Sequence, residues 1–339
     1  MNSKLRIAAI GTGNMARCVH GPSWKRLAEE FPDVELVCAV DRDAERAAAY
    51  ARDFGYAESA TDAEEMLNRI RPDGVTIAVN AEANATISTL VLRHGIPVLS
   101  KKPPAMNLAE LRTLLTAARR PEADSIVPHQ VAFNRRYTPI VSFFETLRKE
   151  WESEAPFRFC RCDFYRDHRY DEDFSTTMVH GYDLVKFLLH APYLRGSIAR
   201  QGVCPEHPHV RNTVIWGEMA DGGAALLNFC PSAGVNLERY TMVSEKRSVT
   251  IDVPCCPGDG GGRLIVETID SASREIITPE SSPEYAWRPF QSGFYQENRA
   301  FLEHLRGDSP FPDDFLDAAD LVGLMEHCRD GKTTFDFSS

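Results

Sequence analysis

The first residues that suggest chemistry form a glycine-containing turn near the start of the chain. The apolar segment 5–10 runs into Gly11-Thr12-Gly13-Asn14-Met15-Ala16. In this G-x-G-x-x-A spacing the first glycine permits a tight turn, the second lets backbone approach a phosphate, and the alanine permits close helix packing. The free N–H groups at the start of the following helix attract phosphate. The spacing therefore predicts a dinucleotide site that contains Gly11, Thr12, Gly13, Asn14 and Met15.

The next apolar segment ends at Asp41, which bears on the choice of cofactor. A carboxylate at this place accepts hydrogen bonds from the adenosine ribose hydroxyls and repels a 2′-phosphate. This favours NAD. Arg42 follows directly and could instead pair with that phosphate, so NADP stays possible. The alternative for Arg42 is a solvated charge in a turn.

Alternating strands and helices are needed to position these residues. Short apolar runs lie at residues 5–10, 35–40, 74–79, 97–100 and 125–131, with a possible strand near 55–57. Between them, helical periodicity covers residues 15–30, 44–53, 63–69, 83–94 and 108–119. Asn107 followed by Glu110 predicts a capping box. This alternation is typical of βαβ units, so we expect an α/β Rossmann domain with a doubly wound parallel sheet over residues 1–131.

After residue 131 the pattern changes to strands in succession. Strands are expected at residues 157–165, 212–219, 224–230, 238–243, 248–253 and 263–269. Helices are expected at residues 139–151, 176–189, 296–305 and 315–328. Consecutive strands at this spacing predict an α+β domain with a large, mainly antiparallel sheet. We assign residues 132–339 to this domain, for substrate binding and oligomerisation.

Three further segments resemble motifs of one enzyme family. Residues 98–105 read Val-Leu-Ser-Lys-Lys-Pro-Pro-Ala and are similar to V-L-x-E-K-P-x-A. Residues 131–139 are similar to G-F-x-R-R-F-x-P, and residues 176–183 match D-x-x-x-H-x-x-D with one change. With the glycine turn, they resemble the glucose-fructose oxidoreductase, inositol dehydrogenase and MocA (Gfo/Idh/MocA) family over nearly the whole chain. The resemblance implies an NAD(P)-dependent oxidoreductase that transfers hydride between the cofactor and a secondary hydroxyl of a sugar, cyclitol or sugar derivative.

The resemblance also implies roles for single residues. Lys102 would be the active-site lysine, whose ammonium at the carboxyl end of a strand stabilises charge on the reacting oxygen. His180 would be the general base that takes the hydroxyl proton, because imidazole titrates near neutral pH. Asp183, one helical turn further on, would support the imidazole.

Further residues are expected to contact the cofactor or the substrate. The remaining cofactor contacts are Asn80, Glu82 and Asn84, together with Lys102. The substrate-side candidates are Asn134, Arg135, Tyr137, Tyr165, Arg166, His168 and Thr176. Tyr165 and Arg166 could equally be strand-edge residues. Arg136 could equally fix the domain junction through ion pairs.

Some residues depart from the family pattern. Thr176 stands where the family often has an aspartate, so His180 loses one possible carboxylate partner. Lys101 replaces a glutamate, and a second ammonium near Lys102 would lower the pKa of one of them. Asn80 and Asn84 stand where many members have proline and histidine. We still expect cofactor binding, whereas these changes put the catalytic roles of the neighbouring residues in question.

Charge and composition limit the kinds of partner. The formal charge of −11 disfavours nucleic acid and anionic membranes, which need clustered Lys and Arg. No apolar run approaches the roughly 20 residues that span a bilayer, and the start does not read as a signal peptide. We therefore expect a cytoplasmic protein with a small-molecule substrate.

The nine cysteines do not read as a disulfide framework, and no metal is expected. Cys204, His207 and His209 have metal-like spacing but lack a fourth ligand nearby, so a polar loop is the favoured interpretation. The vicinal pair Cys255-Cys256 and the strand pair Cys160 and Cys162 suggest no chemistry.

Two other functions stay open. One is an NAD-dependent glycosidase of the same fold family, in which transient oxidation of the sugar allows the aglycone to leave. The other is an NAD(P)-binding sensor or regulator without catalysis. By resemblance, pairing through the open face of the C-terminal sheet predicts a homodimer or homotetramer.

Overall fold

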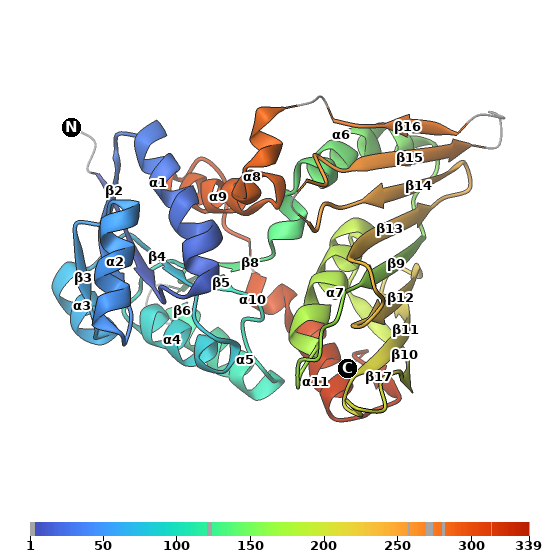
Figure 1. The fold of residues 1–339 in the computed structure, drawn as a ribbon, viewed down its shortest axis with the longest axis horizontal. Coiled ribbons are helices and arrows are strands. Elements are labelled where there is room, and N and C mark those ends of the chain that lie inside the picture. Colours follow the sequence, from blue (N-terminus) through green and yellow to red (C-terminus); the bar gives the residue numbers. More distant parts are fainter. Residues whose placement is uncertain are drawn as a thin grey trace. The chain divides into compact units, whose positions relative to one another are not determined.

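The computed structural model describes residues 4–120, 124–256, 258–268, 274–279, 282–312 and 314–338 (Figure 1). Its internal contacts divide the chain into two units. Unit 1 contains Met1–Phe133 and Phe294–Val322, and unit 2 contains Asn134–Gly293 and Gly323–Ser339. The first division falls close to the one expected after residue 131. The grouping of Phe294–Val322 with unit 1 differs from the expectation, which placed all later residues in the second domain.

Unit 1 contains a six-stranded sheet in the order β3-β2-β1-β4-β5-β8, and all its neighbouring strands are parallel. The strands are β1 (Leu5–Ile10), β2 (Val34–Val40), β3 (Glu58–Ala60), β4 (Gly74–Ile77), β5 (Val98–Lys101) and β8 (His129–Ala132). The predicted parallel sheet is thus confirmed. The single strand expected at 125–131 is instead two, because Pro128 interrupts it. Its first part, β7 (Ser125–Ile126), pairs with β6 (Arg119–Arg120) in a separate ribbon.

Helices connect these strands, and side chains cap several of them. They are α1 (Gly21–Glu30), α2 (Ala44–Phe54), α3 (Ala63–Ile70), α4 (Ala81–Arg93) and α5 (Leu108–Ala118). The side chain of Asn107 accepts the N–H of Glu110 at 2.9 Å, as the capping-box prediction requires. The helix expected at 15–30 begins with a π-helical turn, η1 (Ala16–His20). Pro22 has no N–H for the carbonyl of Cys18, and the wider turn accommodates its ring.

Residues 294–322 pack on unit 1 through apolar and ionic contacts. Helix α9 (Phe294–Arg306) places Phe301 edge-to-face against Trp24, with ring centroids 6.4 Å apart. Arg306 forms an ion pair with Asp33 at 2.6 Å. The short helix α10 (Asp314–Asp317) supplies a carboxylate oxygen that accepts the N–H of Val131 at 2.8 Å. These long-range contacts explain why this segment belongs to unit 1.

His20 lies buried in η1 and predicts how stability depends on pH. Burial lowers its pKa from 6.5 to about 4, although its hydrogen bond with Asn298 opposes the shift. The unfolded chain therefore takes up this proton first. The stability that depends on neutral His20 is complete above pH 6.5 and is lost as pH falls towards 4. The loss amounts to about 3 kcal/mol at most.

Urea unfolding at several pH values checks this prediction. A His20→Asn variant should show a shallower fall in the free energy of unfolding over that window. A His209→Asn variant removes an exposed imidazole and should retain the fall. Equal slopes for the wild-type and His20→Asn proteins would contradict the prediction.

Unit 2 contains a nine-stranded sheet in the order β16-β15-β14-β13-β9-β12-β11-β10-β17. The strands are β9 (Phe159–Tyr165), β10 (Tyr193–Gly202), β11 (Arg211–Met219), β12 (Ala224–Cys230), β13 (Leu237–Val243), β14 (Arg247–Asp252), β15 (Arg263–Thr268), β16 (Glu275–Ile277) and β17 (Thr334–Asp336). Only the β9 and β12 pairing is parallel, which confirms the mainly antiparallel prediction. Ile269, the predicted end of β15, lies outside the described residues.

Helix α7 (Ser175–Leu189) covers one face of this sheet. A Cβ on Gly181 would lie 2.6 Å from the Phe229 ring and 3.3 Å from Cys162 Sγ, so only glycine permits this close packing. Side chains alternate along a strand. Cys160, Cys162 and Phe164 of β9 are buried towards α7, whereas Asp163 and Tyr165 lie on the other face. Helix α6 (Pro139–Glu154) precedes β9. In the described part of the chain, no helix combines the length and the apolar character that crossing a bilayer requires.

Candidate active site

The glycine turn leaves space where a ligand would approach the backbone. Gly11 has a φ of +90°, and a Cβ there would lie 2.7 Å from the carbonyl oxygen of Ala78. Only glycine fits this position. A Cβ on Gly13 would meet no atom within 4 Å, and no side chain caps the helix that follows Met15. The turn lies between β1 and β4, where the strand order of the sheet reverses. These features fit a pyrophosphate.

Asp41 holds the turn in place. Its Oδ2 accepts the Thr12 N–H and the Thr12 hydroxyl, both at 2.9 Å. Its Oδ1 accepts the Asp43 N–H at 3.0 Å and Arg46 Nη2 at 2.9 Å. Burial alone would raise the pKa of Asp41, but the backbone and side-chain hydrogen bonds outweigh it and lower the pKa. Asp41 is therefore a carboxylate at neutral pH, as ribose recognition requires. Arg42 is exposed.

Asn84 positions the segment that carries Lys102. It is almost fully buried in α4, and its Nδ2 lies 3.0 Å from Ser100 Oγ, 2.5 Å from the Lys101 carbonyl and 2.8 Å from the Pro103 carbonyl. Lys102 follows β5 directly and is half-buried. Asn84 thus has a structural role that its expected role as a cofactor contact did not include.

Lys101 at the end of β5 contacts the segment that follows the neighbouring strand β4. Its Nζ donates to the carbonyl of Val79, which follows β4, at 3.2 Å. Burial lowers the pKa of Lys101, and Glu82 partly opposes this shift. Burial, rather than the expected repulsion from Lys102, is therefore the main cause of this shift. Glu82 and Asn80 are both exposed near the start of α4.

In unit 2, Arg135 lies against the candidate base His180. Arg135 belongs to the 3-10 helix η3 (Asn134–Tyr137), and its Nη1 lies 3.4 Å from His180 Nε2. A guanidinium can only donate, so Nε2 is the accepting nitrogen and a neutral ring carries its proton on Nδ1. Arg135 Nη1 also donates to Asn134 Oδ1 at 3.0 Å. The structure therefore brings Asn134, Arg135 and His180 together.

Asp183 lies one turn further along α7, where it pairs with Arg136. Arg136 Nε contacts both carboxylate oxygens, at 3.0 and 3.1 Å, and Nη2 makes a third contact. Asp183 is almost fully buried. This ion pair lies within unit 2, where it joins η3 to α7. Thr176 donates its hydroxyl to the Asp173 carbonyl at 3.1 Å near the start of the helix.

Glu238 contacts the candidate site residues Arg135 and Arg166, and the sequence pattern did not single it out. It is fully buried in β13 and forms ion pairs with Arg135, at 2.7 Å, and with Arg166. Burial would raise its pKa, but the two arginines lower the pKa to about 2. The alternation of residues along β13 could have indicated that Glu238 is buried. Glu238 alternates with buried Tyr240 and Met242, and a carboxylate on the buried face of a strand needs partners.

The other substrate-side candidates are spread over unit 2. Arg166 lies near the group, because it shares Glu238 with Arg135 and stacks on Phe164 at 3.8 Å. Tyr165 lies on the opposite face of the sheet, where its hydroxyl donates to Asp163 at 3.0 Å. His168 is exposed beside Asp167. Tyr137, at the end of η3, is half-buried.

The fold and the glycine turn define an α/β dinucleotide-binding domain followed by an α+β domain. Residues 5–129 match a family model described as "Oxidoreductase family, NAD-binding Rossmann fold". The N-terminal part of the chain thus matches the model of the Gfo/Idh/MocA family, whose motifs the sequence resembles.

Several named proteins are similar to this chain in sequence or in fold. The chain is 29% identical over 150 residues to D-apiose dehydrogenase from Paraburkholderia graminis, a match that spans 44% of this chain and 38% of that protein. It is 24% identical over 331 residues to scyllo-inositol 2-dehydrogenase (NADP(+)) IolU from Bacillus subtilis, over 95% of this chain and 88% of that protein. The solved complex of levoglucosan dehydrogenase with NADH and levoglucosan has the same fold, with a TM-score of 0.78, 18% identity and coverage of 99% and 100%.

A Gly13→Val substitution should abolish NAD binding, because its side chain would occupy the open space beside the turn. Calorimetry should show affinity lowered by more than about a hundredfold, since pyrophosphate contacts would be lost. Gly202→Val is a matched control, because a Cβ there also meets no atom within 4 Å. Equal NAD affinity in both variants would mean that the turn does not contact the cofactor.

Proposed function

We propose that this protein is an NAD(P)-dependent dehydrogenase that acts on a secondary hydroxyl of a sugar, cyclitol or sugar derivative. Relatives named as D-apiose, D-glucoside and inositol dehydrogenases support this class of substrate. The observation that carries the proposal is the position of Lys102. Asn84 donates hydrogen bonds to the carbonyls on either side of Lys102, just after β5. This is the sheet edge that also holds the glycine turn. Ligands of parallel sheets bind at that edge.

Each candidate residue would have a separate role in hydride transfer. Bound NAD would accept the hydride that leaves the substrate carbon. Lys102 would stabilise negative charge on the substrate oxygen. His180 would take the hydroxyl proton through Nε2, the nitrogen that faces Arg135. Arg135 would donate to the same oxygen, with Asn134 beside it. Asp183 and Arg136 would fix α7 against η3 and hold the imidazole in place.

NAD is the cofactor that Asp41 favours, because its charge would repel a 2′-phosphate. Exposed Arg42 and the NADP(+)-dependent relative IolU keep NADP as the second candidate. Comparing the dissociation constants of the two cofactors by calorimetry tests this choice.

A substrate screen tests the function. Sugars, cyclitols and their derivatives would be supplied with NAD or NADP, and NADH or NADPH absorbance would be followed. Parallel reactions with aryl glycosides would detect released aglycone. We expect cofactor reduction with at least one polyol. Aglycone release without net reduction would favour the glycosidase, and NAD binding without either reaction would favour a sensor.

The sheet of unit 2 also suggests self-association. Val214 and Trp216 on β11 are 39% and 48% exposed, on the face opposite buried Ile215. Large apolar side chains on an open sheet face are typical of a contact surface. We propose a homodimer or homotetramer that covers this face, and light scattering measures its mass.

A further inference from the structure

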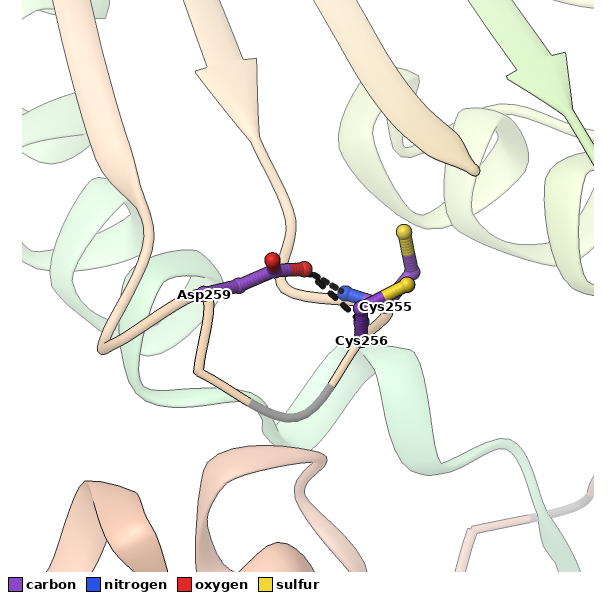
Figure 2. Close-up of side chains that lie close together, drawn as sticks. All are labelled: Cys255, Cys256 and Asp259. Carbon is purple, nitrogen blue, oxygen red and sulfur yellow. Dashed lines mark hydrogen bonds between the residues drawn. The ribbon is translucent and has the colours of Figure 1, made fainter. Parts of the chain in front are cut away.

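Two cysteines and an aspartate lie close together in the loop between β14 and β15 (Figure 2). One candidate ligand atom from each of Cys255, Cys256 and Asp259 lies within 4.8 Å of the other two. Both cysteines are free thiols that are partly exposed, and Asp259 is exposed. Ions in solvent can therefore reach this cluster.

The backbone of the loop holds the carboxylate of Asp259 in place. Its Oδ2 accepts the N–H of Cys255 at 2.9 Å and the N–H of Cys256 at 2.7 Å, as Figure 2 shows. Gly258 and Gly260 have φ values of +93° and +67°, which glycine adopts without strain. Ionised carboxylates have about four lone-pair sites, so Asp259 keeps acceptor capacity for a cation.

The spacing of the three groups suits a tetrahedral divalent ion. Zinc binds thiolates at about 2.3 Å and carboxylates at about 2.0–2.2 Å, so the ligand atoms of one tetrahedral ion lie about 3.4–3.8 Å apart. The candidate atoms lie within 4.8 Å of one another, so side-chain movements of up to about 1 Å would bring them to this spacing. Cys256 and Asp259 also have C-x-x-D spacing, one residue type away from the C-x-x-C of many zinc sites. Thiolates disfavour magnesium and calcium.

Cysteine binds metals as the thiolate. Binding of a cation to the cluster would therefore release the two thiol protons to the buffer.

We propose that Cys255, Cys256 and Asp259 bind one zinc-like divalent cation, with water as the fourth ligand. This departs from the expectation that the vicinal pair carries no chemistry. Two members of the group Cys204, His207 and His209, which has metal-like spacing in the sequence, make other contacts. The His207 ring stacks on Tyr170 at 4.4 Å, and His209 Nε2 lies 3.1 Å from the Tyr170 carbonyl. The proposal does not depend on the dehydrogenase activity.

Cobalt titration tests the site without an activity assay. Reduced, metal-stripped protein would be titrated with Co²⁺, which reports thiolate ligation by a charge-transfer band and tetrahedral geometry by intense visible bands. We expect one equivalent to bind, protons to be released, and Zn²⁺ to displace the cobalt. Cys256→Ser and Asp259→Asn should each weaken binding more than about tenfold, because each removes one ligand.

Cys204→Ser is the matched control, because it removes a partly exposed cysteine from another loop. It should leave the titration unchanged, and circular dichroism would confirm that every variant is folded. Cobalt binding without a thiolate band would overturn the proposal. Unchanged cobalt affinity in Cys256→Ser or weakened affinity in Cys204→Ser would also overturn it, as would no binding to the fully reduced protein.

Discussion

Replacing Lys102 with alanine should lower turnover by about two to four orders of magnitude and leave NADH affinity nearly unchanged. As an alcohol becomes a ketone, its oxygen must lose a proton. A cation and a base beside that oxygen therefore matter more in the transition state than in the bound substrate. His180→Ala should cause a loss of similar size for the same reason. Steady-state kinetics with the polyol found by screening, and NADH fluorescence titration, measure the two quantities.

Controls separate this effect from loss of structure. Lys25→Ala removes an exposed lysine from α1 of the same unit and should keep full turnover. Asn84→Ala should lower turnover with Lys102 still present, because three contacts that hold residues 100–103 would be lost. Near-normal turnover of a folded Lys102→Ala enzyme would overturn the assignment of the active site.

Replacing Glu238 with glutamine should cost about 3–5 kcal/mol of stability, because two buried guanidiniums would lose their shared carboxylate. Turnover should fall as well, since Arg135 is the residue that Glu238 holds beside His180. Urea unfolding followed by circular dichroism measures the stability. Because the pKa of folded Glu238 is about 2, its stabilisation is present above the ordinary value of 4.5 and lost as pH falls through 2.

Glu218→Gln provides the matched control. Glu218 pairs with Arg195 at 2.8 Å, but both side chains are about half exposed, at 41% and 59%. Such a pair contributes about 0–1 kcal/mol. A Glu238→Gln variant that is no less stable than Glu218→Gln would show that the buried network does not support unit 2.

The elements with strong local signals were predicted well. Strand β1 has the bounds expected from its apolar run and the glycine turn after it, and α2 begins after Asp43, whose side chain caps it. Strand β10 was missed, because few of its residues are apolar and its pairing with β11 and β17 makes it a strand. The helix expected at 315–328 is two helices, α10 and α11 (Ala319–Arg329). Local patterns cannot report such long-range pairings.

The candidate site also combines residues with a local sequence signal and residues whose contacts are long-range. Spacing and resemblance point to the glycine turn, Asp41, Lys102 and His180 as candidates, because close backbone approach and proton transfer allow few residue types. The partners of these residues were not predictable. Asn84 reaches residues 100–103 from another element, and Glu238 reaches Arg135 across 103 positions of sequence.

The sequence by itself predicted the parallel sheet, the mainly antiparallel sheet and the glycine turn, since each depends on periodicity or on residues adjacent along the chain. Only the tertiary structure decided which charges neutralise one another. It paired Asp183 with Arg136, joined Glu238 to two arginines, and placed Tyr165 on the sheet face away from α7. A buried charge must find its partner in space, and that partner depends on how strands and helices pack.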